Sequence, residues 1–156
     1  STCPGRPISL CCGDQEVYLF ASDYEGVLMF KLDAMNGGLV RSSQASRVCL
    51  GDDQQLVWCG VSYSGLLGAF LSSGRFLINL TRGTDRWTEI LDTSKTLSEK
   101  FEVAWPVYFD TTTLSACTCK MTDGGFPDPY PVPHVIDFTF RIPELSTDSF
   151  SNSYEE

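Results

Sequence analysis

Residues 101–109 read FEVAWPVYF, and large apolar side chains alternate there with other residues. This pattern places Phe101, Val103, Trp105, Val107 and Phe109 on one face of an extended chain. A two-residue period is typical of a strand that buries one face. The same period returns in residues 134–142, HVIDFTFRI, and no comparably long stretch shows a helical period. The two stretches predict an all-β chain.

Short runs of strand-forming residues continue along the chain and are separated by clusters of Gly, Asn, Asp and Ser. They predict strands at residues 7–12, 16–21, 26–33, 46–50, 55–61, 66–72, 74–80, 86–91, 100–109, 113–119 and 134–142. Short strands at such spacing predict an antiparallel β-sandwich or squashed barrel of roughly ten strands. At most one short helical turn is expected, within residues 92–100, with Thr93 or Ser94 as its cap.

One stretch, GVLMFKLDAMNGGLV at residues 26–40, resembles the strand, turn and strand of a propeller blade. A propeller repeats that unit several times, and the sequence shows it once. A closed propeller is therefore not expected within these residues, whereas a fragment of one stays open.

The length of 156 residues suits a single domain. We assign residues 1–143 to this domain. Residues 144–156, ELSTDSFSNSYEE, are acidic and rich in Ser, which predicts a flexible tail. The sequence has no initiator Met, no signal peptide and no apolar run near 18 residues, so we expect an excised domain that does not insert into a membrane.

The net charge of −9 argues against a nucleic-acid partner. A phosphate backbone repels an acidic surface unless basic residues are clustered, and the sequence contains no such cluster.

The cysteines are odd in number, and several lie in apolar runs, which favours reduced, buried thiols. They are Cys3, Cys11, Cys12, Cys49, Cys59, Cys117 and Cys119. The alternative is a secreted domain with three disulfides and a glycan at Asn79, which begins the sequence Asn79-Leu80-Thr81.

Catalytic chemistry has little support in the sequence, and we expect no enzyme, metal or cofactor. His134 is the only histidine. A thiol–base pair with Cys117 or Cys119 is conceivable, but both cysteines lie in a strand-like run without an orienting third group. The zinc, calcium, phosphate-loop and nucleophile-elbow patterns are absent. A hydrolase that uses two of the twenty acidic residues stays an alternative class.

The candidate binding residues lie in turns that combine an acid with an aromatic residue or an arginine. Arg and Trp are favoured at binding hot spots, and an acid beside a phenol suits a polar ligand such as a glycan. The alternative for Tyr24 and Trp87 is that they only close the ends of the sheets. The candidate residues are Asp23, Tyr24, Asp85, Arg86, Trp87, Asp128 and Tyr130.

The two ends of the chain carry a family resemblance. The opening STCPGRPISL, the reduced-type cysteines and the closing FRIPELSTDSFSNSYEE together resemble the capsid spike of astroviruses. Residues 5–26, GRPISLCCGDQEVYLFASDYEG, are similar to the start of the protruding domain of the hepatitis E virus capsid protein, whose fold astrovirus spikes share.

This resemblance implies a capsid protein that is synthesised in the host cytoplasm and displayed on the virion surface. It further implies attachment to a host cell-surface receptor, either protein or glycan, and recognition by neutralising antibodies. A homodimer is expected separately, because a domain with many large apolar residues can bury one sheet face against its copy. The alternative function is that of a secreted cellular β-sandwich that binds carbohydrate or protein.

Overall fold

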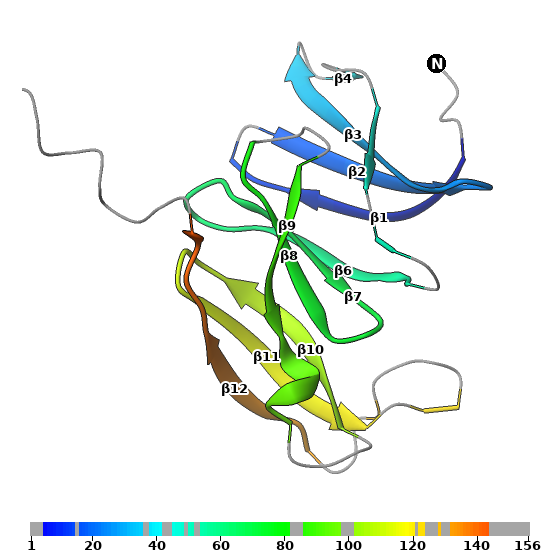
Figure 1. The fold of residues 1–156 in the computed structure, drawn as a ribbon. Coiled ribbons are helices and arrows are strands. Elements are labelled where there is room, and N and C mark those ends of the chain that lie inside the picture. The colour runs from blue at the N-terminus through cyan, green and yellow to red at the C-terminus, as the bar shows by residue number, and fades with distance from the viewer. Residues whose placement is uncertain are drawn as a thin grey trace, which may run out of the picture.

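The computed structural model confirms the all-β class (Figure 1). It describes residues 5–14, 16–35, 38–41, 45–48, 50–51, 54–81, 86–97, 102–120, 122–123, 128 and 132–143. These residues form three antiparallel sheets and one 3-10 helix, η1 (Thr93–Lys95). The helical turn was expected, but its cap is Asp92 and not Thr93 or Ser94. Within the described residues, no helix has the length and apolar character needed to cross a membrane.

The three sheets follow one another along the chain. The N-terminal sheet contains β1 (Arg6–Cys12), β2 (Glu16–Asp23), β3 (Gly26–Met35), β4 (Gly38–Arg41) and β5 (Ser46–Val48). The middle sheet contains β6 (Leu56–Val61), β7 (Leu67–Leu71), β8 (Arg75–Asn79) and β9 (Trp87–Asp92). The C-terminal sheet contains β10 (Glu102–Phe109), β11 (Thr113–Lys120) and β12 (His134–Thr139). Only β4 was not predicted from the sequence.

Each sheet contains a meander in which strands that are neighbours in sequence pair with each other, and β5 lies off this path and pairs with β3. The middle sheet has the order β6-β7-β8-β9, and the C-terminal sheet has the order β10-β11-β12. An antiparallel meander of four strands is also the unit of a propeller blade. The sequence shows that unit once, whereas the structure repeats the meander in three successive sheets. The first strands of the sheets lie side by side, because β6 contacts both β1 and β10.

The middle sheet is covered on both faces. All five residues of β7 are buried. On one face, Phe70 and Phe76 pack with Phe109 and Phe138 of the C-terminal sheet. On the other face, Leu67 joins a cluster with residues of the N-terminal sheet that include Phe20. The sheets therefore form three layers, with the two main apolar clusters between them.

A bulge in β10 changes the side-chain pattern that the sequence predicts. The pairing of β10 with β11 shifts between Pro106 and Tyr108, so Val107 is the extra residue of this strand. Val107 is 57% exposed and Phe109 is 1% exposed. The expectation that Val107 and Phe109 share a face with Val103 is wrong. One inserted residue reverses the face to which every following side chain points. Phe101 lies outside the described residues.

The second stretch with a two-residue period behaves as predicted. Phe138, Phe140 and Ile142 are all buried in the cluster between the middle and C-terminal sheets. No bulge interrupts the pairing of β12 with β11. The alternation in the sequence therefore carries through to the structure.

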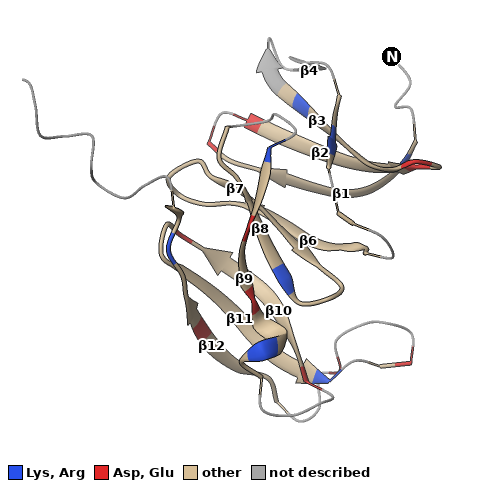
Figure 2. Ribbon diagram, viewed as in Figure 1, with Lys and Arg blue, Asp and Glu red and all other residues tan. Residues whose placement is uncertain are grey.

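Charged residues occur on strands of all three sheets (Figure 2). The buried polar residues in the described part are Ser62, Asn79 and Thr93, and none of them is charged. Charged groups instead form ion pairs near strand ends and edges, such as Arg75 with Glu89 at 3.1 Å. The cohesion of the layers is therefore apolar.

Candidate functional site

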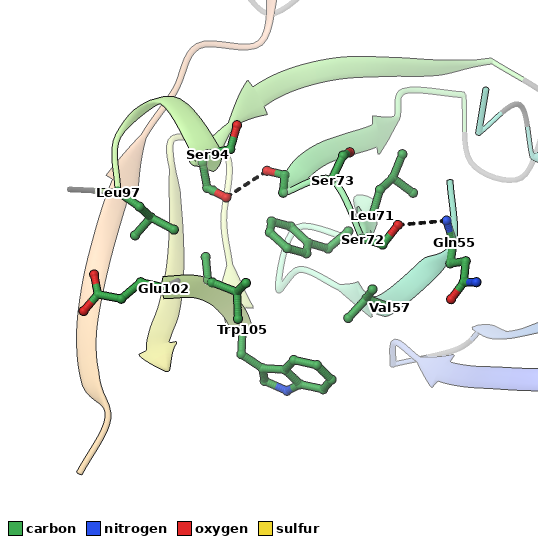
Figure 3. Close-up of a pocket in the computed structure, with 14 residues that line it drawn as sticks. Gln55, Val57, Leu71, Ser72, Ser73, Ser94, Leu97, Glu102 and Trp105 are labelled. Carbon is green, nitrogen blue, oxygen red and sulfur yellow. Dashed lines mark hydrogen bonds between the residues drawn. The ribbon is translucent and has the colours of Figure 1, made fainter. Parts of the chain in front are cut away.

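A pocket of about 470 Å³ lies between the middle and C-terminal sheets (Figure 3). Its walls come from the start of β6, the end of β7, the β7–β8 turn, the η1 segment and the start of β10. Small-ligand sites commonly measure about 300–1,000 Å³. The pocket is therefore large enough to hold a side chain and part of a backbone.

The β7–β8 turn forms one rim of the pocket and is fixed by Gly74. This glycine has a φ of +86°, a value that other residues rarely adopt. Its N–H donates to the Leu71 carbonyl at 2.9 Å. Its carbonyl accepts from the Thr93 N–H at 2.9 Å and from the Thr93 hydroxyl at 2.8 Å. These bonds hold η1 against the turn.

The η1 segment forms the opposite rim. The Asp92 carboxylate accepts from the Ser94 N–H at 3.2 Å and from its hydroxyl at 2.6 Å. The bond from Ser94 is the main reason why the pKa of Asp92 is lowered, and Lys95 adds to the effect. After η1, the Leu97 N–H donates to the Thr93 carbonyl at 3.2 Å. This bond turns the chain so that Leu97 lines the pocket.

The pocket combines an apolar lining with a polar rim. Leu97 and Val57 lie on opposite sides of it, and Trp105 lies below them in the view of Figure 3. Ser73 and Ser94 lie at the rim, and among the described residues that line the pocket Glu102 is the charged one. Such a lining suits an apolar group and fixes its orientation through a few polar contacts.

A second concavity, of about 510 Å³, is lined by the β1–β2 turn, the β6–β7 turn and Tyr108. Some of its polar groups already have partners. Glu16 accepts from the Tyr18 hydroxyl at 2.6 Å and pairs with Lys31. The Ser62 hydroxyl accepts from the Leu66 N–H at 3.0 Å. The first pocket is the better candidate, because its apolar lining would be covered by a ligand.

Asp23 and Tyr24 lie in the turn between β2 and β3, away from the lining of this pocket. The guanidinium of Arg47 donates to both Asp23 oxygens, at 3.1 and 3.2 Å, and to Glu25 at 2.9 Å. The hydrogen bond from Arg47 lowers the pKa of Asp23. Tyr24 is 95% exposed. The acid in this turn is engaged in an ion pair, and the phenol faces solvent.

Of the other candidate binding residues, the structure describes Arg86, Trp87 and Asp128. Trp87 is half-buried at the start of β9, where its ring centroid lies 6.3 Å from that of Phe20. Its indole N–H is buried without a hydrogen-bond partner. This placement matches the alternative in which Trp87 closes the sheet stack. Arg86 is exposed, and the Asp128 N–H donates to the Lys120 carbonyl at 2.7 Å. Asp85 and Tyr130 lie outside the described residues.

Sequence reasoning did not find the pocket residues Val57, Leu97 and Trp105. Each belongs to a different element, and the pattern of a single strand does not show which strand faces it. One signal was present, since Leu97 is an apolar residue just after the predicted helical turn.

The thiol–base pair weighed from the sequence is excluded by the strand register. Cys117 is paired opposite Val135, whereas His134 is paired opposite Thr118. Neighbouring residues of a strand point to opposite faces, so Cys117 and His134 point away from each other. Cys119 shares the face of Cys117, and burial raises the pKa of its thiol.

A hydrolase with two acidic residues finds no support in the described residues. A general acid requires a carboxyl group whose pKa is raised. The aspartates whose pKa is clearly perturbed are Asp23, Asp92 and Asp110, and in each the pKa is lowered. For Asp110, the main cause is hydrogen bonding from the backbone N–H groups of Thr112 and Thr113.

The secreted alternative predicts disulfides and a glycan at Asn79, and the described residues support neither. The cysteines that the structure describes are free: Cys11, Cys12, Cys59, Cys117 and Cys119. Cys3 and Cys49 lie outside the described residues. Asn79 is fully buried, and its side chain accepts from the Thr81 N–H at 3.2 Å. A glycan cannot be attached to an amide in that position of the folded domain.

Comparison with known families gives one match. Residues 1–144 match the model of a family described as the middle region of the minichromosome loss protein, Mcl1. A comparison with curated proteins finds no match.

This match corrects the viral interpretation. The chain is not an astrovirus capsid spike or a relative of the hepatitis E virus protruding domain, because the matched family is cellular. The predicted capsid function, host attachment, receptor binding and virion-surface location are therefore wrong. The predicted recognition by neutralising antibodies had no basis other than this resemblance. The resemblance depended on the composition of the two chain ends, which many unrelated domains share. The secreted carbohydrate or protein binder is unsupported as well.

Proposed function

The chain belongs to the family of the middle region of the minichromosome loss protein Mcl1, and we propose that it acts in chromosome maintenance as a protein-binding domain. The family takes its name from the loss of minichromosomes, which supports a role in keeping chromosomes during division. We propose a nuclear location for the same reason. The role proposed for the domain is binding and not catalysis, because the strand register turns His134 away from Cys117, the thiol–base pair that the sequence offered.

The observation that carries the binding role is the pocket between the middle and C-terminal sheets. Its apolar lining includes Val57, Leu97 and Trp105. An apolar side chain of leucine size that leaves water for such a lining contributes about 1.5–3 kcal/mol. That energy is too small for stable binding alone, so the partner also contacts the rim. We propose that the ligand is an extended segment of a partner protein that inserts one large apolar side chain.

The charge of the domain favours a basic segment. Glu102 is the charged residue of the pocket lining, and the chain carries a net charge of −9. Several basic residues are already engaged in ion pairs, among them Lys31, Arg47, Arg75 and Lys95. We therefore propose a partner with Lys or Arg beside the apolar anchor, and no nucleic acid as direct partner.

A second copy of the chain stays a proposed partner through the C-terminal sheet. Val107 and Val135 are 57% and 65% exposed on this sheet, and Tyr108 beside the bulge is also exposed. Large apolar side chains in solvent favour burial against another surface. Light scattering over a range of concentrations checks for this dimer.

The pocket is tested by replacing Leu97 with Lys and, as the matched control, Leu10 with Lys. Leu10 lies on β1 and is 57% exposed, away from the pocket. In cells that depend on the protein, we expect L97K to raise the rate of minichromosome loss and L10K to leave it unchanged, at equal protein levels. Equal loss rates for the two variants would refute the proposal.

A second variant keeps the test independent of folding. Glu102→Lys reverses the charge at the pocket without changing its apolar lining. Synthetic peptides with a central Leu flanked by Lys should bind the parent more tightly than peptides flanked by Glu. In the E102K variant, this preference should be reduced or reversed. Fluorescence anisotropy measures it, and an unchanged preference would remove Glu102 from the site.

A further inference from the structure

Two buried thiols meet between the N-terminal and middle sheets. Cys11 lies on β1 and Cys59 lies on β6, and each is 8% exposed. Both are free and belong to the same buried cluster. The Ser9 hydroxyl lies 3.1 Å from the Cys59 sulfur. The pocket on the other side of the middle sheet contains none of these residues.

The strands that carry these thiols are not joined by a sheet ladder. In the described residues, β1 pairs with β2, and β6 pairs with β7. β1 and β6 nevertheless contact each other, and the cysteines belong to the same buried cluster as Phe20 and Leu67. Side-chain contacts, including the one between Ser9 and Cys59, therefore hold the two strands together at this point. A covalent bond there would change how firmly the sheets are connected.

We propose that Cys11 and Cys59 form an oxidation site, which hydrogen peroxide converts into a disulfide between the two sheets. Both thiols lie in one buried cluster, and the hydroxyl of Ser9, two residues before Cys11 on β1, already lies 3.1 Å from the Cys59 sulfur. A disulfide requires Cβ atoms about 3.5–4.5 Å apart. Peroxide is small enough to reach groups that are nearly buried. Disulfides in cellular compartments are usually transient and redox-sensing, which fits a site without a permanent bond.

The two thiols have different roles in this reaction. The neighbouring Cys11 and Ser9 side chains lower the pKa of the Cys59 thiol. The pKa of Cys11 is raised by the neighbouring Cys59 and by burial. Because the thiolate is the nucleophile, Cys59 reacts first.

The reaction balances with peroxide as the oxidant. The Cys59 sulfur attacks one peroxide oxygen, the O–O bond breaks, and a sulfenic acid and one water form. The Cys11 sulfur then attacks the sulfenic sulfur, the S–O bond breaks, and the hydroxyl leaves as a second water with the Cys11 proton. Two thiols and one peroxide thus give one disulfide and two waters. Each sulfur loses one electron, and the peroxide gains two.

The experiment treats the intact protein with one equivalent of hydrogen peroxide, alkylates the remaining thiols and maps the peptides by mass spectrometry. We expect a linked Cys11–Cys59 peptide that has lost two hydrogens and is released by dithiothreitol. The oxidised parent should melt at a higher temperature than the reduced parent, because the bond closes a long loop. Mapping the parent protein requires no substitution, so a folding defect cannot obscure the result.

Cys12 provides the matched control, because it is adjacent in sequence but exposed. Cys12→Ser should keep the linked peptide and the temperature shift, and Cys59→Ser should lose both. A disulfide that involves Cys12, a further oxidation of Cys59 without a bond to Cys11, or no loss of thiols would each overturn the proposal. None of these results tests the peptide pocket, which lies between the middle and C-terminal sheets and contains neither cysteine.

Discussion

The bulge in β10 predicts that two neighbouring apolar residues contribute very differently to stability. Phe109 is 1% exposed and Val107 is 57% exposed, although the sequence pattern gives them the same face. Changing each residue to Ala in turn tests the bulge. We expect a large loss of stability for Phe109→Ala and almost none for Val107→Ala.

The size of the loss follows from the contacts of Phe109. Its ring centroid lies 5.1 Å from that of Phe76, at an interplanar angle of 71°. It lies 6.2 Å from that of Trp58, at 82°. A Cβ added at Gly68 would lie 2.9 Å from the Phe109 ring, which shows how closely the backbone of β7 approaches it. Truncating a phenylalanine in such a site costs about 3–5 kcal/mol.

This cost is a large fraction of the stability of an ordinary domain, which is about 5–15 kcal/mol. At this chain length, each kcal/mol corresponds to roughly 2–4 °C, so Phe109→Ala should lower the melting temperature by roughly 6–20 °C. An exposed substitution such as Val107→Ala should change stability by no more than about 0.5 kcal/mol.

Urea unfolding followed by circular dichroism measures both variants under the same conditions. A common slope of the transition for the parent and both variants shows that the unfolded states are comparable. If Val107→Ala lowered the midpoint as much as Phe109→Ala, the side chain of Val107 would be buried, and the bulge would be misplaced.

Two further predictions concern the residues that the sequence singled out for binding. Trp87→Ala should lower stability by about 1–3 kcal/mol, because Trp87 packs on Phe20. The loss is smaller than for a fully buried tryptophan, since Trp87 is half-buried. An unchanged urea midpoint would contradict this packing. Hydrogen bonding from Arg47 lowers the pKa of Asp23, so the stability from this pair is present above about pH 3.9 and is lost as the pH falls below it. Asp23→Asn should therefore lower the urea midpoint at neutral pH and have little effect in strong acid, whereas an equal effect at both pH values would exclude the pair.

The fold class and most strands could be predicted because the information is local. Alternation along one strand and Gly, Asn or Asp between strands are visible without knowing any partner. β12 followed its pattern, since Phe138 is buried as expected. β4 was missed, because GLVR at residues 38–41 is short and begins at the second of two glycines, Gly37-Gly38, that indicate a turn. The bulge at Val107 was missed because it is defined by pairing with β11 and not by the residues of β10 alone.

The binding residues were harder to predict for the same physical reason. Trp87 and Tyr24 are the residue types that binding sites favour, but residue type does not distinguish exposed from packed. Trp87 lies against Phe20, and Tyr24 stands in solvent. The pocket instead depends on Leu97 and Val57, which are ordinary core residues in a sequence. Their role follows from the gap between two sheets, and that gap is fixed by the hydrogen bonds of Gly74 to η1.

A stack of three sheets gives the middle sheet a special position. Its two faces contact different neighbours, so a change on one face need not alter the other. The pocket lies on the side of the C-terminal sheet, and the Cys11–Cys59 pair lies on the side of the N-terminal sheet. Residues of β7 alternate between the two interfaces, with Leu67 toward one and Phe70 toward the other. Oxidation of the thiols can therefore change the shape of the pocket only by shifting the backbone of the middle sheet. Both faces of this sheet are packed, and buried residues such as Ala69 leave its backbone little room to move.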